Sequence, residues 1–194
     1  MAYNDLNVTA GKGDTVLGPL WWNPTPITTA LDLDFDPTAV AGWVRLGHAM
    51  TEGVDNSQEA DNSEVIVWGA KTIRVNYTGF KDTVVVRFAS STDPDVLKVV
   101  FGADNVSVTA SGAVKLIVKS RQPEIGTLLI MGVTDDGRKR WIVVHKAQAD
   151  LNVSRTFSDE DIVSIETTFA CLDAGEDAGA HYELTEALTE SAPA

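Results

Sequence analysis

The feature that most constrains this fold is an excess of β-branched residues over leucine. Val, Thr and Ile number 23, 19 and 9 among the 194 residues, against 14 Leu. β-Branched side chains lose rotamer freedom in a helix but pack well on a pleated surface, so this bias favours strands. A chain of this length can bury a core without cross-links, and its one cysteine, Cys171, excludes an intrachain disulfide. The sequence therefore predicts a mainly β fold, either a sandwich or barrel-like.

Apolar residues that recur with period two locate the strands. In residues 71–77 and 163–171, alternate apolar side chains share one face, which is typical of a half-buried strand. Asp136-Gly137 stands between two apolar runs and predicts a hairpin turn. The further strand candidates are residues 64–68, 83–89, 106–109, 113–120, 126–134 and 140–149.

One short helix is predicted over residues 93–102. Asp93 suits the N-cap, Pro94 suits the first helical position, and Gly102 is placed to end the helix. A single helix in a β-rich chain packs its apolar stripe across a sheet. The stripe predicted to pack in this way is Val96, Val99 and Val100.

The chain divides into three predicted parts. Residues 1–40 hold four of the seven prolines and the pair Trp21-Trp22, and they predict an extended N-terminal arm whose tryptophans need a packing partner. Residues 41–184 form the predicted β-sandwich domain, in which residues 48–63 are a long polar loop suited to contact with another chain. The last part, residues 185–194, is predicted to be a flexible tail.

Charge is unevenly distributed along the chain. Fifteen basic and 28 acidic residues give a net charge of −13, which disfavours binding to nucleic acid phosphates. Residues 51–64 contain five acids and no base, whereas residues 98–158 contain nine bases and five acids. These stretches are either solvated faces or complementary patches that meet across subunit contacts. The residues predicted for such contacts are Trp21, Trp22, Glu52, Asp55, Glu59 and Asp61.

Motifs for catalysis and for metal binding are missing from the sequence. His48, His145 and His181 lie far apart with no ligand spacing, and no nucleophile elbow is present. We therefore expect neither an enzyme nor a bound cofactor or metal. No apolar run approaches the roughly 20 residues that span a bilayer, so no membrane partner is expected.

The order of five stretches resembles a known family. They are GWVRLGHAMTEGV (42–54), SEVIVWGAKTIRV (63–75), DPDVLKVVFGADNV (93–106), RWIVVHKAQA (140–149) and FSDEDIVSIETTFACLD (157–173). Together they resemble the major tail tube proteins of long-tailed, non-contractile bacteriophages (siphophages), especially those of actinobacterial hosts. The resemblance covers most of residues 42–173.

The resemblance implies a fold and an assembly. The fold would be a tail-tube-like β-sandwich or barrel with one flanking helix. Six subunits would form a ring by joining strands around a lumen, and stacked rings would form the tube through which DNA is ejected. The implied partners are further copies of the chain, a tape measure protein, and tail terminator and tip proteins. Double-stranded DNA would pass through without binding, and the protein would reside in the virion after assembly in the host cytoplasm.

Two further expectations depend on this resemblance. Glu166 on the polar face of residues 163–171, and Arg74 on that of 71–77, are candidates for facing the lumen, although each could be an ordinary surface or contact residue. Deleting residues 50–62 should leave a folded monomer that cannot form tubes. Two alternatives stay open at this stage: another virion structural protein, such as a capsid decoration or tail terminator protein, or a cell-surface β-sandwich binding module.

Overall fold

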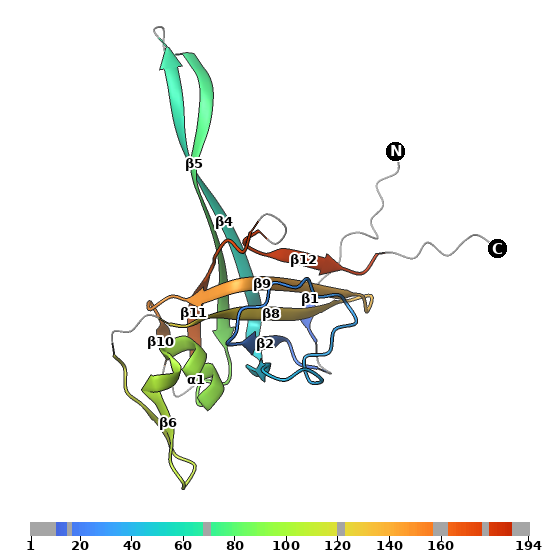
Figure 1. Cartoon of the computed structure of the whole chain (residues 1–194), viewed down its shortest axis with the longest axis vertical. Coiled ribbons are helices and arrows are strands. Elements are labelled where there is room, and N and C mark those ends of the chain that lie inside the picture. The colour runs from blue at the N-terminus through green and yellow to red at the C-terminus, as the bar shows by residue number, and fades with distance from the viewer. Residues whose placement is uncertain are drawn as a thin grey trace, which may run out of the picture.

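The computed structural model describes residues 11–14, 17–67, 71–119, 123–156, 163–175 and 179–187 (Figure 1). In chain order the elements are β1 (Gly11–Gly13), β2 (Leu20–Asn23), β3 (Val44–Arg45), β4 (Ala49–Val67), β5 (Lys71–Phe88), helix α1 (Pro94–Phe101), the 3-10 turn η2 (Ala103–Asn105), β6 (Val106–Val108), β7 (Val114–Leu116), β8 (Ile125–Thr134), β9 (Lys139–Ala149), β10 (Ser154–Thr156), β11 (Ser164–Cys171) and β12 (Tyr182–Thr185).

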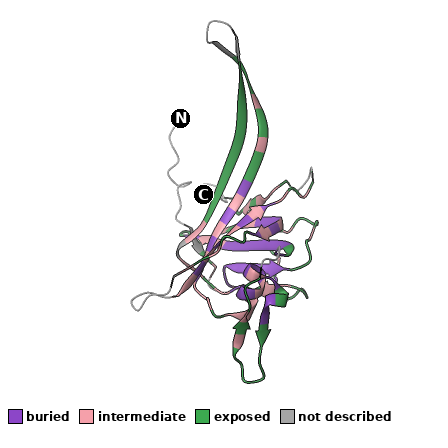
Figure 2. Ribbon diagram, turned by 90° about the vertical axis from the view of Figure 1, so that its left-hand side faces the viewer, coloured by how far each residue is buried: buried purple, intermediate pink, exposed green. Residues whose placement is uncertain are grey.

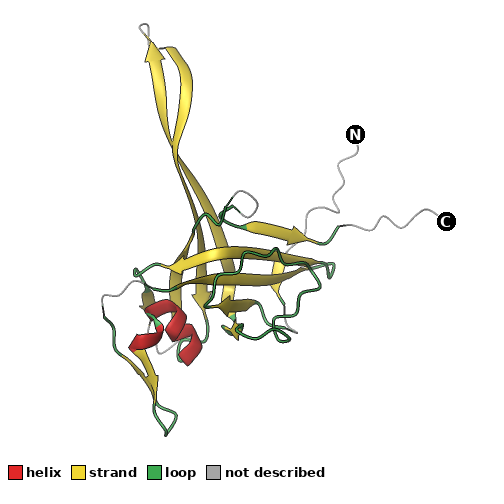
Figure 3. Cartoon of the chain, in the orientation of Figure 1, coloured by secondary structure: helices red, strands yellow, loops and turns green. Residues whose placement is uncertain are grey.

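Ten strands form one antiparallel sheet in the order β3-β2-β8-β9-β11-β5-β4, with β1 beside β8, β10 beside β11 and β12 beside β9. Strands β6 and β7 form a separate two-stranded sheet. The sheets do not close into a barrel, and α1 is the one α-helix among the described residues (Figure 3). The predicted mainly β, sandwich-like fold with one flanking helix is confirmed.

The main core lies on one face of β11 and β5. Cross-strand partners share a face of a sheet, and the pairs Ile165–Phe88 and Phe169–Val84 are fully buried. The alternating burial along β11 matches the period-two pattern of its sequence. Figure 2 shows this buried centre between two exposed ribbons.

Strands β8 and β9 are covered on both faces. Their apolar runs do not alternate, as expected for strands buried on two sides. Trp22 and Leu128 belong to the main core, whereas Trp21 and Leu129 belong to a second cluster on the opposite face. Residues of the 24–43 segment and of β12 pack against that second cluster, namely Leu31, Leu33, Phe35, Trp43, Tyr182 and Leu184.

Helix α1 covers an end of the main core. The Asp93 side chain accepts a hydrogen bond from the backbone N–H of Asp95 at 2.9 Å, and Gly102 ends the helix with φ of 90°. Val96 and Val100 are fully buried and Val99 is 8% exposed, all within the main core cluster. The turn between β8 and β9 has Gly137 at φ of 88°, and Thr134 N–H donates to Arg138 C=O across it at 2.8 Å.

The predicted loop at residues 48–63 is wrong. These residues are mostly strand, because β4 (Ala49–Val67) pairs with β5 over almost its whole length. Their side chains show no apolar alternation because the outer part of the ribbon has solvent on both faces, so backbone pairing rather than burial defines the strand. The two strands leave the body of the protein as a long hairpin (Figure 1).

The predicted arm and tail also need correction where the structure describes them. Strands β1 and β2 pair with β8, so this part of residues 1–40 belongs to the sheet. Thr185 ends β12, and the Glu186 N–H donates to Lys139 C=O at 3.0 Å, so the start of the 185–194 tail is also paired. Residues 1–10 and 188–194 lie outside the described residues.

Candidate assembly surface

The second face of β4, β5, β11 and β10 is polar, and we call it the polar face. Glu166 of β11 lies directly across from Arg87 of β5 on this face. The Arg87 Nε donates to Glu166 Oε2 at 2.9 Å, and Nη2 contacts the same oxygen. Both side chains are more than one third exposed, so this ion pair adds at most about 1 kcal/mol of stability. Its main consequence is that the Glu166 charge is neutralised locally.

Arg74 lies on the same side of β5 as the polar face but far from Glu166. It is the cross-strand partner of Val65, in the projecting part of the β4–β5 hairpin. Thirteen residues separate Arg74 from Arg87 along β5, which corresponds to roughly 40 Å of strand. The structure therefore does not bring the two predicted wall residues together within one chain.

The opposite face of the projecting hairpin carries an apolar row: Val75, Tyr77 and Phe80. Their exposed fractions are 43%, 76% and 64%. Phe80 pairs with Ala60 and Tyr77 with Asn62, because the register shift between them skips Thr78. This β-bulge keeps the apolar row on the face that continues from the buried Val84 and Val86. The strand predicted at 71–77 is confirmed, but its apolar side is exposed among the residues that the structure describes.

The root of the projecting hairpin is held by a buried carboxylate. Asp82 is 3% exposed, and its side chain contacts Nδ1 of His181 from the segment before β12. The amide of Asn56 on β4 donates to Asp82 Oδ1 at 2.8 Å. Buried polar groups satisfied in this way favour one geometry. These contacts tie β4, β5 and the C-terminal segment together where the ribbon leaves the core.

The residues predicted for subunit contacts fall into two groups. Trp21 and Trp22 are only 6% and 5% exposed, because adjacent residues of β2 point to opposite faces of a sheet that is covered on both sides. They are core residues rather than contacts offered to a neighbour, which corrects that interpretation. Asp55, Glu59 and Asp61 are exposed and lie on one side of β4, which is the polar face. Glu52 lies in β4, and its side chain is outside the described residues.

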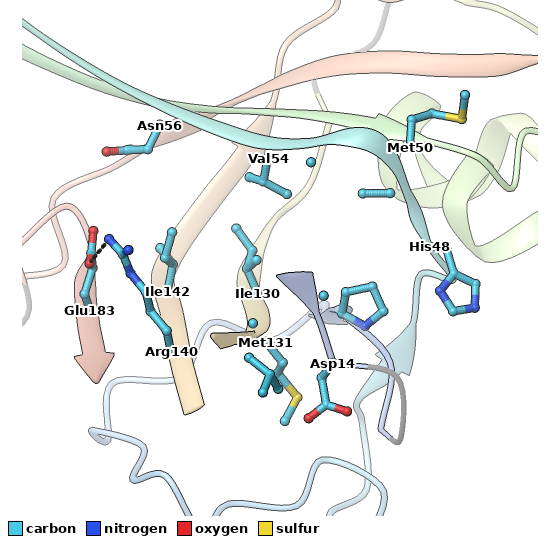
Figure 4. Close-up of a pocket in the computed structure, with 16 residues that line it drawn as sticks. Asp14, His48, Met50, Val54, Asn56, Ile130, Met131, Arg140, Ile142 and Glu183 are labelled. Carbon is cyan, nitrogen blue, oxygen red and sulfur yellow. Dashed lines mark hydrogen bonds and ion pairs between the residues drawn. The ribbon is translucent and has the colours of Figure 1, made fainter. Parts of the chain in front are cut away.

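A cavity of about 900 Å³ opens between β4 and the strands β1, β8 and β9. Figure 4 shows Met50 and Val54 on one wall and Ile130 and Ile142 on the other. The Arg140–Glu183 ion pair, at 3.3 Å, lies at its rim. Its lining therefore combines apolar side chains with polar ones, which include Asp14, His48 and Asn56.

Groups suited to metal binding do not gather in the described part of the chain. No cluster of three or more His, Cys, Asp or Glu side chains there could hold a metal ion. Burial, with a smaller effect of Asp82, raises the pKa of the Cys171 thiol to about 12, so this cysteine stays protonated and unreactive. Among the described helices, none has the length and apolar character to cross a membrane.

Sequence reasoning missed Arg87 and the role of Phe80. Arg87 lies 79 residues from its partner Glu166, and only the β5–β11 register joins them. Phe80 stands in a stretch with no clean alternation, because the bulge at Thr78 breaks the period. The exposed aromatic residues of 71–80 are a signal in the sequence, but their exposure is known only from the structure.

Comparison with known proteins gives one match. A family model described as "Phage tail tube protein" matches residues 1–194. No curated protein matches the chain.

Proposed function

The chain belongs to the phage tail tube protein family and is thus a structural component of the virion tail tube; on this premise we propose how its copies assemble. Copies join side by side through the free edges of β4 and β10 into rings of six, and the rings stack into a tube. This tube is the conduit for DNA ejection. The polar face lines the lumen, and the projecting hairpins connect neighbouring copies.

The observation that supports this proposal is the strand order β4-β5-β11-β10. All three junctions in this series are antiparallel, so β10 runs opposite to β4. When identical copies stand side by side in one orientation, β4 of one copy meets β10 of the next in antiparallel pairing. Within the described residues, the outer edges of β4 and β10 have no paired strand. A four-strand unit with two free edges can therefore repeat around a ring without changing the pairing pattern.

The polar face has the chemistry needed for passage of DNA. Over the body of the protein, the described residues of this face include three carboxylates, Asp55, Glu59 and Glu166, and two cations, Lys81 and Arg87. The excess negative charge among these residues gives a wall that repels phosphate weakly. Only wall charges act on the DNA, because salt screens charges beyond roughly 8 Å.

Further partners follow from the same proposal. The tube encloses a tape measure protein, and tail terminator and tip proteins close its ends. Double-stranded DNA passes through without being held. We also propose an actinobacterial host, on the resemblance of residues 42–173 to siphophage proteins from such hosts. The chain acts in this assembly without catalysis.

Electron microscopy of the concentrated, purified chain tests the assembly directly. We expect rings and hollow tubes, because one interface closes and the other repeats along the axis. Isolated monomers or closed trimers at all concentrations would contradict the proposal and would favour a capsid decoration role.

Glu166→Lys tests the lumen wall. The substitution puts a lysine across from Arg87 and changes the charge of the polar face by two units per copy, from −1 to +1 at this position. In phage that carry it, we expect assembled tails and slowed DNA ejection, measured separately by microscopy and by an ejection assay. The matched control is Arg87→Glu/Glu166→Lys, which reverses the ion pair without changing net charge and should eject normally. Unchanged ejection in the single variant would remove Glu166 from the wall, and failed assembly of both variants would place it at a subunit contact.

A further inference from the structure

Two ribbons project from opposite ends of the molecule along its longest axis. The outer part of the β4–β5 hairpin forms one end and the β6–β7 hairpin forms the other, in both perpendicular views (Figures 1 and 2). In a tube built of copies that all point the same way, opposite ends of successive copies meet. The chemistry of the two ends therefore bears on how rings stack.

The β6–β7 hairpin carries an apolar face of its own. Val106 and Leu116 are cross-strand partners that pack on the main core, and the next pair, Val108 and Val114, continues that face outward. Val108 is 51% exposed, and Val118, just after β7, is 71% exposed. The β6–β7 ribbon thus resembles the projecting hairpin: in both, the face that packs on the core continues outward as exposed apolar side chains.

The two ends also differ in charge. Residues 106–119 contain Lys115 and Lys119 and no acid, whereas the outer part of the projecting hairpin, residues 60–80, contains two acids, Asp61 and Glu64, and two bases, Lys71 and Arg74. Lys98, just before the β6–β7 ribbon in the sequence, has an acidic partner within the chain, Asp95 at 2.8 Å.

Lys115 and Lys119 have no acidic partner in the described residues, and Asp61, on the outer part of the hairpin, has no basic one. These unpaired charges of opposite sign favour, to a small extent, an approach of the two ends of successive copies.

We infer that the β6–β7 hairpin is the docking surface for the projecting hairpin of a copy in the adjacent ring. The apolar row of Val75, Tyr77 and Phe80 packs on the face that holds Val108 and its cross-strand partner Val114. Two ribbons stacked face to face bury such rows at the spacing of roughly 10 Å found between packed sheets. Lys115 is the cross-strand partner of Ser107, so it lies on the opposite face of the β6–β7 ribbon from Val108 and borders the contact rather than packing in it. The inference rests on the proposed stacking of rings and identifies the partner surface within the chain.

Cysteine cross-linking tests which surfaces touch. Val108→Cys is combined in one chain with Val75→Cys, Tyr77→Cys or Phe80→Cys, and assembled tubes are treated with a thiol-specific bismaleimide cross-linker and run on denaturing gels. A cross-linker with a reach of about 10 Å spans the distance between packed ribbons, and three hairpin positions cover the unknown register. The native Cys171 is buried in the core and does not take part. The control pairs the same hairpin cysteines with Val40→Cys, which is 46% exposed on the 24–43 segment.

We expect a ladder of covalent multimers from at least one Val108→Cys combination, at least ten times stronger than from its Val40→Cys control. Tubes that form normally but give no ladder with Val108→Cys would overturn this inference and leave the proposed function intact. Ladders from the Val40→Cys pairs alone would also overturn it, by placing the hairpin on the 24–43 segment. If the unsubstituted chain forms neither rings nor tubes, the proposed function fails, and the inference fails with it.

Discussion

A chain in which residues 60–80 are replaced by Asn-Gly is expected to fold normally and to form no tubes. The replaced segment is the outer part of the β4–β5 hairpin, in which the apolar row is 43–76% exposed within a single chain. Its removal takes nothing from the core, and Asn-Gly joins Glu59 to Lys81, which are already cross-strand partners. The Asp82 contacts at the root of the ribbon stay in place. We therefore expect an unchanged melting temperature and complete loss of tubes in electron micrographs.

The matched control for this truncation keeps the hairpin and changes only the apolar row. Val75→Ser/Tyr77→Ser/Phe80→Ser retains the length and backbone pairing of the ribbon and should also fail to form tubes. If neither the triple serine variant nor the truncated chain forms tubes, apolar contact through this row drives assembly. A truncated chain that polymerises like the unsubstituted one would show that the projecting hairpin has no part in tube formation.

The truncation replaces the deletion suggested by the sequence alone. Deleting residues 50–62 would remove residues 54–58 of β4, which pair with residues 82–86 of β5 beside the main core. Such a chain would lose part of its sheet, so a failure to assemble would report misfolding rather than a missing contact. Replacing only residues 60–80 keeps this paired region, so misfolding and the loss of a subunit contact can be told apart.

Val100→Asp is expected to lower the free energy of unfolding by about 4 kcal/mol at neutral pH. Val100 is fully buried in α1 and packs in the main core. A carboxyl group in such a site has its pKa raised by about 3 units, and each unit corresponds to about 1.4 kcal/mol. Urea unfolding measures the loss. A stability close to that of the unsubstituted chain would mean that α1 does not pack as described.

The pH dependence distinguishes a buried charge from lost packing. The new carboxyl has a raised pKa in the folded state. The loss in free energy of unfolding is therefore full above that folded-state pKa, and it declines as the pH falls toward the pKa of Asp in the unfolded chain, about 3.9. Val100→Ala loses packing alone, so its destabilisation should stay constant over the same pH range. Val99→Asp, at a site that is 8% exposed, should show the same trend with a smaller amplitude.

Local rules in the sequence determined the elements that depend on neighbouring residues. The alternation in β11, the Asp93 cap and Gly102 end of α1, and the Asp136-Gly137 turn all appear in the structure where the sequence predicts them. Each depends on backbone geometry over a few residues, so a single sequence contains the necessary information. Family resemblance was likewise visible in the sequence, because it depends on the order of short stretches.

Tertiary structure alone decided which surfaces are covered. Trp21 and Trp22 indicated a packing partner, but that partner is the chain itself on both faces of β2. The polar run of β4 read as a loop because its pairing with β5 uses backbone hydrogen bonds, which leave no trace in side-chain period. The Glu166–Arg87 pair and the one-sided apolar row likewise depend on register between strands far apart in sequence. Register is set by the summed burial of the whole sheet, and no local pattern contains that sum.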